Sequence, residues 1–511
     1  MSLAKAYSVS LLGLAGTIIE IEAEVSSNLP SFVLVGLPDA SLSEAKDRVR
    51  AAAQNSGLVL PGRRVTVNLS PASVPKRGSG FDLAIAMAIL ATDERVNASS
   101  VANWIQIGEL GLDGSLRAVT GVLASVLAAK RAGWSKVIVP IANLAEAQMV
   151  TEMTILGARN LSDVAAFHGA KLPGIDLAVE SAAAPIAAPA GVPALDLSDV
   201  VGQEEAISAL TVAAAGGHHM LMIGPPGAGK TMLAERLPTI LPELDGDEWI
   251  ETTAVRSVAG LPPQVGWSGI AKRRPFEAPH QSASLVSLIG GGAKYPNPGL
   301  VSLANEGVLF LDEAPEFQRN VLDALRQPLE SGEVFIHRGS GVARFPARFQ
   351  LIMAANPCPC GNFAGKSRSC TCSSSIRVAY LGKLSGPLLD RIDIRLKLQP
   401  PNLAEVALAG SEMGMKRTNS GEVRVRVQDA RELAAKRLEG TPWRLNSQVP
   451  GSYLRRELKI DSAARAPIDR ALDLGTLSMR GYDRCLRLAW TCADLAGRDR
   501  VTVDDVAMAA L

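Results

Sequence analysis

The chain has 511 residues, of which 52 are Lys or Arg and 51 are Asp or Glu, so its formal net charge is +1 with His neutral. This balance excludes a protein coated in basic charge, so any contact with nucleic acid must come from a local patch or an assembled ring. Hydrophobic residues make up 47% of the chain, a globular composition that excludes wholesale disorder. The length predicts about three domains.

The start of the chain does not resemble a targeting segment. Residues 1–16 lack the long apolar stretch and the cleavage site of a secretory signal. No run of 18 apolar residues occurs, so no transmembrane helix is expected. We therefore expect a cytoplasmic protein without a membrane partner.

Residues 1–171 are predicted to form an α+β domain. Apolar residues alternate with glutamates over residues 19–25, the pattern of a half-buried strand. Further strands are predicted at Phe32–Val35, Val65–Asn68 and Lys136–Pro140, and helices at Ser41–Asn55 and Phe81–Ala91. Residues 172–196 are rich in Ala and Pro and are predicted to be a semi-rigid linker, because closely spaced prolines disrupt helix and sheet; a buried loop is the alternative.

The remaining chain divides into two predicted parts. Residues 197–400 alternate strand and helix with short Gly/Pro turns, which predicts an α/β domain with a parallel sheet covered by helices. Residues 401–511 are predicted to be mainly helical, including Val427–Leu438, Ala463–Leu474 and 481–497.

The sequence GPPGAGKT at residues 224–231 lies between a predicted strand, Met220–Ile223, and a predicted helix, Lys230–Leu241. This is a Walker A motif in its required context, which disfavours a chance Gly-rich turn. Lys230 would place a cation on the outer phosphates, and the Thr231 hydroxyl would ligate Mg²⁺. The residues expected to contact the nucleotide are Gly224, Pro225, Pro226, Gly227, Ala228, Gly229, Lys230, Thr231 and Met232.

Two further strands are predicted to end in polar residues beside this loop. Residues 308–313 read VLFLDE, so Asp312 would hold Mg²⁺ and Glu313 would activate the attacking water; a solvated strand end is the alternative. Asn356 follows a strand predicted at Phe349–Ala355 and would hold the catalytic water, with a turn-forming Asn before proline as the alternative.

Four of the six cysteines lie within fifteen residues: Cys358, Cys360, Cys370 and Cys372. Four thiolates can close a tetrahedral Zn²⁺ site with Zn–S distances of about 2.3 Å, which would be structural because it leaves no open position. A C-x-C pair is tighter than the usual ligand spacing, so free buried thiols remain the alternative. Cys485 and Cys492 are seven residues apart on a predicted helix, where packing is the default role.

Together these motifs resemble those of AAA+ ATPases. The segments RPFEAPHQSASLVSLIGGG (274–292) and PGLVSLANEGVLFLDEAPEF (298–317) resemble the magnesium-chelatase-like ATPases, and among them the bacterial ComM/YifB group of competence-associated proteins. The resemblance covers essentially the whole chain. One departure is Gln281, where the family usually has a second His after His280.

The resemblance implies a homo-hexameric ring with ATP sites between subunits. In LSGPLLDRIDI (384–394), Arg391 matches the arginine finger that would reach the neighbouring subunit's ATP. A surface salt bridge with Asp390 or Asp393 is the alternative. Arg480 matches the sensor-2 position and would contact the nucleotide, unless it is an ordinary residue at a helix start.

The family also places a β-hairpin before the strand that ends in Asn. Here Glu333–His337 and Val342–Phe345 flank RGSG at 338–341. His337, Arg338 and Arg344 would line the pore of the ring with positive charge and track a phosphate backbone. An external hairpin with ordinary solubilising charges is the alternative.

Residues 66–140 resemble the protease domain of Lon. An ungapped match puts Gly80 where that family has its Ser nucleophile and Ala124 where it has its Lys, so we expect no proteolysis. A shifted pair made of Ser79 and Lys76 is the alternative. The domain would serve assembly or substrate engagement.

The resemblance implies an ATP- and Mg²⁺-dependent DNA translocase or branch-migration helicase that acts in recombination or natural transformation, on single-stranded or branched DNA. An ATP-driven remodeller of a protein partner, as in magnesium chelatases, is the second hypothesis. An ATP-dependent protease is the third.

Overall fold

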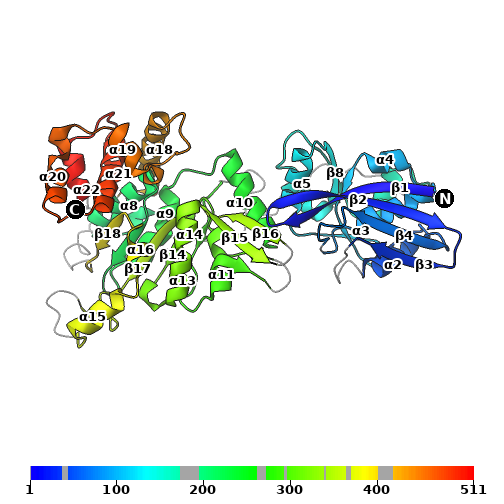
Figure 1. Cartoon of the computed structure of the whole chain (residues 1–511), viewed down its shortest axis with the longest axis horizontal. Helices are drawn as coiled ribbons and strands as arrows, with labels where there is room; N and C mark the ends of the chain where they lie inside the picture. Colours follow the sequence, from blue (N-terminus) through cyan, green and yellow to red (C-terminus); the bar gives the residue numbers. More distant parts are fainter. Residues whose placement is uncertain are drawn as a thin grey trace.

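The computed structural model describes residues 2–36, 44–76, 78–172, 195–261, 272–292, 296–338, 341–363, 370–400 and 418–510. The molecule is elongated, with the N-terminal sheet at one end, a second sheet in the middle and the C-terminal helices at the other end (Figure 1). Almost all of the segment predicted to be a linker lies outside the described residues. The expected mixed α/β architecture with a parallel sheet is confirmed.

A seven-stranded sheet in the order β3-β4-β2-β1-β5-β8-β9 forms the N-terminal part. Its strands are β1 Ser2–Leu12, β2 Ala15–Ser26, β3 Ser31–Val35, β4 Arg64–Ser70, β5 Ile105–Gln106, β8 Lys136–Pro140 and β9 Thr154–Ala158, with a separate ribbon of β6 Glu109–Leu110 and β7 Leu116–Arg117. Its α-helices are α2 Ala45–Asn55, α3 Asp82–Thr92, α4 Ala98–Ala102, α5 Val122–Arg131, α6 Leu144–Ala147 and α7 Leu161–Phe167. All residues of α3 are buried because its sequence, DLAIAMAILAT, is apolar on every face.

A five-stranded parallel sheet in the order β11-β14-β17-β10-β18 forms the middle of the molecule. Its strands are β10 Met220–Ile223, β11 Phe276–Glu277, β14 Val308–Leu311, β17 Gln350–Ala355 and β18 Ile394–Lys397. Two antiparallel ribbons accompany it, β12 Gly290–Gly291 with β13 Asn297–Pro298, and β15 Glu333–Arg338 with β16 Gly341–Pro346. Because the strands are parallel, the loops after β10, β14 and β17 meet at one edge of the sheet.

Helices cover this sheet and continue into the C-terminal part. Around the sheet lie α8 Glu204–Gly216, α9 Lys230–Ile240, α10 Gly246–Val258, α11 Leu285–Ile289, α12 Leu300–Leu303, α13 Arg319–Ala324, α14 Arg326–Ser331, α15 Ser374–Leu381 and α16 Gly386–Leu389. The C-terminal α-helices are α18 Ser420–Arg437, α19 Gly451–Arg456, α20 Ser462–Asp473, α21 Met479–Leu495 and α22 Val503–Ala510. Buried His218 joins the two parts: its Nδ1 lies 2.8 Å from Asp393 Oδ2 and its Nε2 lies 2.8 Å from Thr491 Oγ1.

The N-terminal part packs against the middle part at two places, α10 and the β15–β16 hairpin (Figure 1). At α10, the Gly121 N–H donates to Ser257 O at 3.0 Å, and the Ser257 hydroxyl donates to Glu146 Oε2 at 2.5 Å. At the hairpin, the turn between β1 and β2 lies against β16: a Cβ added to Gly13, whose φ is +66°, would lie 2.8 Å from Arg344 O. Both contacts involve backbone atoms, so they fix the docked position closely.

Glu146 is a buried carboxyl group at this junction. Burial raises its pKa, against hydrogen bonds from Ser257 and Asn143. A carboxyl group with a higher pKa in the folded than in the unfolded state stabilises the fold fully below the unfolded pKa, and this contribution is lost as the pH rises through the folded pKa.

We therefore expect Glu146→Gln to reduce the loss of stability between acidic and neutral pH, measured as the thermal unfolding midpoint at a series of pH values. The control is Glu439→Gln, at an exposed position. Parallel pH profiles for Glu146→Gln and the unsubstituted protein would contradict the assignment.

Candidate active site

The loop after β10 carries glycines where the backbone requires them. Gly227 and Gly229 have φ values of +78° and +82°, a region that side chains disfavour. A Cβ added to Gly224 would lie 2.9 Å from Leu398 O, so only glycine fits there. The Gly224 N–H donates to Ala355 O at 3.1 Å, which ties the loop to the end of β17.

Lys230 is the first residue of α9 and is 9% exposed. Its Nζ donates to Gly224 O at 2.7 Å, to Pro225 O at 3.1 Å and to Asn356 Oδ1 at 3.0 Å. Burial lowers its pKa, and the carboxylates of Asp312 and Glu313 oppose this shift. The structure therefore brings together the predicted cation at the start of α9 and the predicted Asn after β17.

Thr231 and Asp312 are also in contact, because the Thr231 hydroxyl donates to Asp312 Oδ2 at 2.9 Å. A hydroxyl and a carboxylate oxygen are ligands that suit Mg²⁺, so the donor set fits the predicted ion. The buried strand predicted from the four apolar residues of VLFLDE is β14, which ends at Leu311, and Glu313, just beyond it, has φ +49°. A non-glycine residue in this conformation is strained, and such strain gathers at functional sites.

The two predicted arginines, Arg391 and Arg480, lie near each other, and each forms an ion pair with an acidic residue. Arg391 forms an ion pair with Glu330 of α14, and Arg480, at the start of α21, forms one with Asp390. Burial lowers the pKa of Arg391, as do the positive charges of Arg326 and Arg480. The ion pair expected as the alternative for Arg391 was a contact with Asp390 or Asp393; the partner in the structure is instead Glu330.

Glu330 and Arg326 were not predicted as neighbours of Arg391. Both lie on α14, which is separated in the chain from residue 391 by strands β15, β16 and β17. No local pattern in the sequence signals such a contact, because it depends on how α14 and α16 pack.

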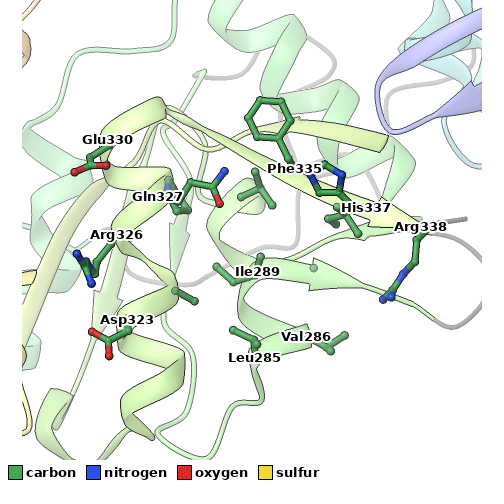
Figure 2. Close-up of a pocket in the computed structure, with 15 residues that line it drawn as sticks. Leu285, Val286, Ile289, Asp323, Arg326, Gln327, Glu330, Phe335, His337 and Arg338 are labelled. Atoms are coloured by element: carbon green, nitrogen blue, oxygen red, sulfur yellow. The ribbon is translucent and has the colours of Figure 1, made fainter. Parts of the chain in front are cut away.

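The β15–β16 hairpin is paired from Glu333↔Pro346 to Arg338↔Gly341. The charge of Arg344 is balanced by an ion pair with Glu333. His337 and Arg338 are exposed on β15, at the rim of a cavity of about 670 Å³ whose other walls are α11, α13 and α14 (Figure 2). Of the three predicted pore residues, Arg344 is paired with Glu333, whereas His337 and Arg338 are exposed and do not pair with Glu333.

The N-terminal part does not show a paired Ser and Lys among the residues that the structure describes. The Ser79 hydroxyl donates to a Glu109 carboxylate oxygen, whereas the buried Lys76 ammonium donates to Pro71 O. Ala124 is buried on α5. The arrangement that a shifted protease pair would need is not formed here.

The four clustered cysteines lie with their sulfur atoms within 4.8 Å of one another. The Sγ–Sγ distances are 3.3 Å for Cys358 and Cys360, 3.7 Å for Cys358 and Cys370, and 3.7 Å for Cys360 and Cys370. A tetrahedral Zn²⁺ site with Zn–S bonds of about 2.3 Å has sulfur–sulfur edges of about 3.8 Å, so the donor set fits zinc. Hydrogen bonding to the Asn362 backbone and to Cys358 lowers the pKa of Cys360 to about 6, which favours the thiolate.

Known families match three segments of the chain. Residues 196–406 match the magnesium chelatase family, subunit ChlI; residues 21–143 match subunit ChlI of Mg-chelatase; and residues 417–511 match the magnesium chelatase subunit ChlI C-terminal family. Among the described residues, no helix has the length and apolar character needed to span a bilayer.

Several curated proteins are similar over nearly their full length. An uncharacterized protein of Mycobacterium tuberculosis is 47% identical over 100% of this chain and 98% of its own length. Competence protein ComM of Haemophilus influenzae is 42% identical over 98% of this chain and 95% of its own length. The magnesium-chelatase 38 kDa subunit of Rhodobacter capsulatus is 29% identical, over 32% of this chain and 51% of its own length.

Proposed function

This chain belongs to the magnesium-chelatase-like family of AAA+ ATPases that includes ComM and YifB, and we propose that it is an ATP-driven motor that moves along DNA as a homo-hexameric ring. The resemblance to this family that was noted from the sequence is thus confirmed. The proposal extends it to a substrate, an assembly and named residues.

The ATP-hydrolysing part of the proposal rests on the contacts at the edge of the parallel sheet. Lys230 binds the outer phosphates, and Thr231 with Asp312 would hold Mg²⁺, which supplies charge neutralisation on the phosphates. Glu313 takes the proton of the attacking water, and Asn356, which contacts Lys230, orients that water. Lys230 already meets Asn356, and Thr231 already meets Asp312, so the roles of these four residues need no movement of strands.

The positions of Arg391 and Arg480 support an active site shared between subunits. Arg391 and Arg480 lie near each other and pair with Glu330 and Asp390, and we infer that they reach the nucleotide of a neighbouring subunit rather than their own. Head-to-tail contacts of this kind close into rings. In the ring, each Arg391 would exchange Glu330 for a γ-phosphate, a stronger partner for a guanidinium.

The DNA part rests on one observation, the exposed His337 and Arg338 on a hairpin beside an open cavity (Figure 2). Repeated around a ring, this hairpin would present a track of cations to a phosphate backbone. The relative named for competence agrees with a role in natural transformation or recombination. The N-terminal part, docked on the same hairpin, would help to engage the substrate and would not act as a protease.

We expect His337→Ala combined with Arg338→Ala to abolish the stimulation of ATP hydrolysis by DNA while leaving the basal rate unchanged. The reason is that the hairpin can no longer bind phosphates, whereas the residues at the sheet edge are not touched. The assay compares hydrolysis with and without single-stranded, duplex and four-way-junction DNA. The salt dependence of binding should also weaken, by about one unit of log–log slope for each phosphate that the variant no longer neutralises.

The matched control for this pair is Arg500→Ala, an exposed arginine whose ion pair is with its neighbour Asp499. If DNA leaves hydrolysis unchanged at every salt concentration, the DNA role is wrong. The favoured function is then a motor that remodels a protein partner, which the similarity to the magnesium-chelatase 38 kDa subunit supports.

We also propose that the four clustered cysteines hold a structural Zn²⁺. Purified protein should contain about one zinc per chain by metal analysis, falling by a large fraction in Cys360→Ser, because four thiolates are needed to close the site. Cys492→Ser, at a buried cysteine outside the cluster, should keep its metal. A folded protein that contains no zinc and takes up none would exclude the site.

A further inference from the structure

We propose that the four-cysteine zinc site controls nucleotide affinity, because the turn that carries two of its ligands packs directly against the phosphate-binding loop. This inference rests on the proposed ATP and zinc sites and adds a regulation that neither of them contains. It concerns Cys358, Cys360, Gly361 and Pro226.

The first step is the contact between the two loops. Cys358 to Gly361 form a tight turn in which the Gly361 N–H donates to Cys358 O at 3.0 Å. Gly361 is buried and has φ +77°. A Cβ added to it would lie 2.8 Å from Pro226 Cγ and 2.9 Å from Pro226 Cδ. The turn therefore forms a wall against the Walker A loop at the closest distance that glycine allows.

The second step is that both ends of the cysteine segment are anchored at the nucleotide site. Its N-terminal end follows Asn356, which accepts a hydrogen bond from Lys230 Nζ at 3.0 Å. Its C-terminal end leads into α15, whose Tyr380 hydroxyl lies close to the backbone of Asn356. The Arg377 guanidinium of α15 stacks 3.9 Å from the centre of the Phe363 ring. A change in the position of the cysteine turn is thus passed to Pro226 and to Asn356 together.

A bound metal would hold this turn in its position against Pro226. Zn²⁺ would tie Cys358 and Cys360, which precede the contact at Gly361, to Cys370 and Cys372, which follow it. Without the metal, four free thiols hold one another only weakly, and the turn can leave Pro226. The metal would thus preorganise the loop that receives the phosphates, so that ordering this segment is not a cost of nucleotide binding.

Linkage makes the inference quantitative. If zinc increases the affinity for nucleotide by a given factor, nucleotide must increase the affinity for zinc by the same factor. A coupling of roughly tenfold lies within the usual range for two linked sites. Both affinities can be measured without DNA, so the result does not depend on the DNA part of the proposed function.

The experiment measures binding of a fluorescent, non-hydrolysable ATP analogue with Mg²⁺ to full-length protein. It compares protein with zinc, protein stripped by a chelator that spares Mg²⁺, and stripped protein with zinc restored. We expect roughly tenfold weaker binding after stripping and full recovery on restoration. Zinc affinity, measured at a buffered free Zn²⁺ concentration, should rise by the same factor when the analogue is bound.

A pair of glycine variants tests the contact without removing the metal. Gly361→Ala should keep its zinc but weaken nucleotide binding, because the new Cβ meets Pro226. Gly440→Ala is the matched control: its φ is +80°, but nothing lies within 4 Å of an added Cβ. It carries the same backbone strain without the contact and should bind nucleotide normally.

The outcomes are distinguishable. Equal nucleotide affinity with and without zinc, in protein that binds both, overturns this inference but does not contradict the proposed motor function. Protein that binds no nucleotide overturns the proposed ATP site itself. If stripping unfolds the chain, as followed by circular dichroism, Gly361→Ala decides: normal affinity in that variant overturns the inference.

Discussion

Replacing Glu313 with Gln should lower the rate of ATP hydrolysis by about 10²- to 10⁴-fold and leave nucleotide binding unchanged, the expected loss when a general base is removed. The amide keeps the size of the carboxyl group but cannot take the proton of the attacking water. In the described part of the chain no hydrogen bond joins the Glu313 side chain to Lys230, Thr231 or Asn356, so the variant loses only the electrostatic effect of this carboxylate on Lys230 and keeps the hydrogen bonds of the phosphate-binding groups. Steady-state hydrolysis and equilibrium binding of nucleotide, measured on one preparation, separate the two effects.

Glu316→Gln is the matched control for this variant. Glu316 lies three residues further along, is partly exposed and forms an ion pair with Lys383 at 3.4 Å. Its replacement should leave turnover close to that of the unsubstituted protein. Near-normal turnover in Glu313→Gln would refute the assigned role, and the strained backbone at that residue would then need another explanation.

The second large effect is expected for Arg391→Ala, which should lower turnover by about 10³-fold or more, the scale of an arginine finger. The same reduction is expected for Lys230→Ala, but for a different reason: this variant damages its own subunit's site and still offers Arg391 to its neighbour. The two defects therefore lie on opposite sides of one interface. This difference can be tested by mixing.

Subunits of Arg391→Ala and Lys230→Ala, mixed while dissociated and then assembled, should regain activity that neither has alone. With random placement in equal amounts, half of the sites are intact in their own subunit and half of those receive a finger, so about a quarter of full activity is expected. Glu313→Gln mixed with Lys230→Ala is the control, because both defects are in the subunit's own site, and it should stay inactive. No recovery in the first mixture would mean that Arg391 acts within its own subunit.

The parts of the fold that follow from local pattern could be predicted from the sequence. Strands β8 and β10 have the predicted bounds, and β17 differs by one residue, because apolar runs between turn residues mark buried parallel strands. Strand β18, Ile394–Lys397, was not predicted as such, since the charged Arg395 and Lys397 interrupt the apolar run that marks a strand such as β10. The loop after β10 could be predicted because its residues are adjacent in the chain.

The contacts between distant segments could not be predicted in the same way. Arg480 is 90 residues from Asp390, and Ser257 is 111 residues from Glu146. Such pairs depend on the docking of helices, and a charged residue in a sequence offers many possible partners. The roles assigned to Lys230, Glu313, Arg391 and the cysteines remain predictions that the experiments above test.

In the proposed ring, the turn between β1 and β2 would have a mechanical consequence. Gly13 abuts the backbone of Arg344, and Leu12 lies against Gly341, where an added Cβ would come within 2.9 Å of Leu12 Cδ2. A power stroke that displaces β16 must either carry the whole seven-stranded sheet with it or shear this backbone contact. In such a ring the N-terminal sheet and the β15–β16 hairpin would therefore move together, and a longer side chain at position 13 would push them apart.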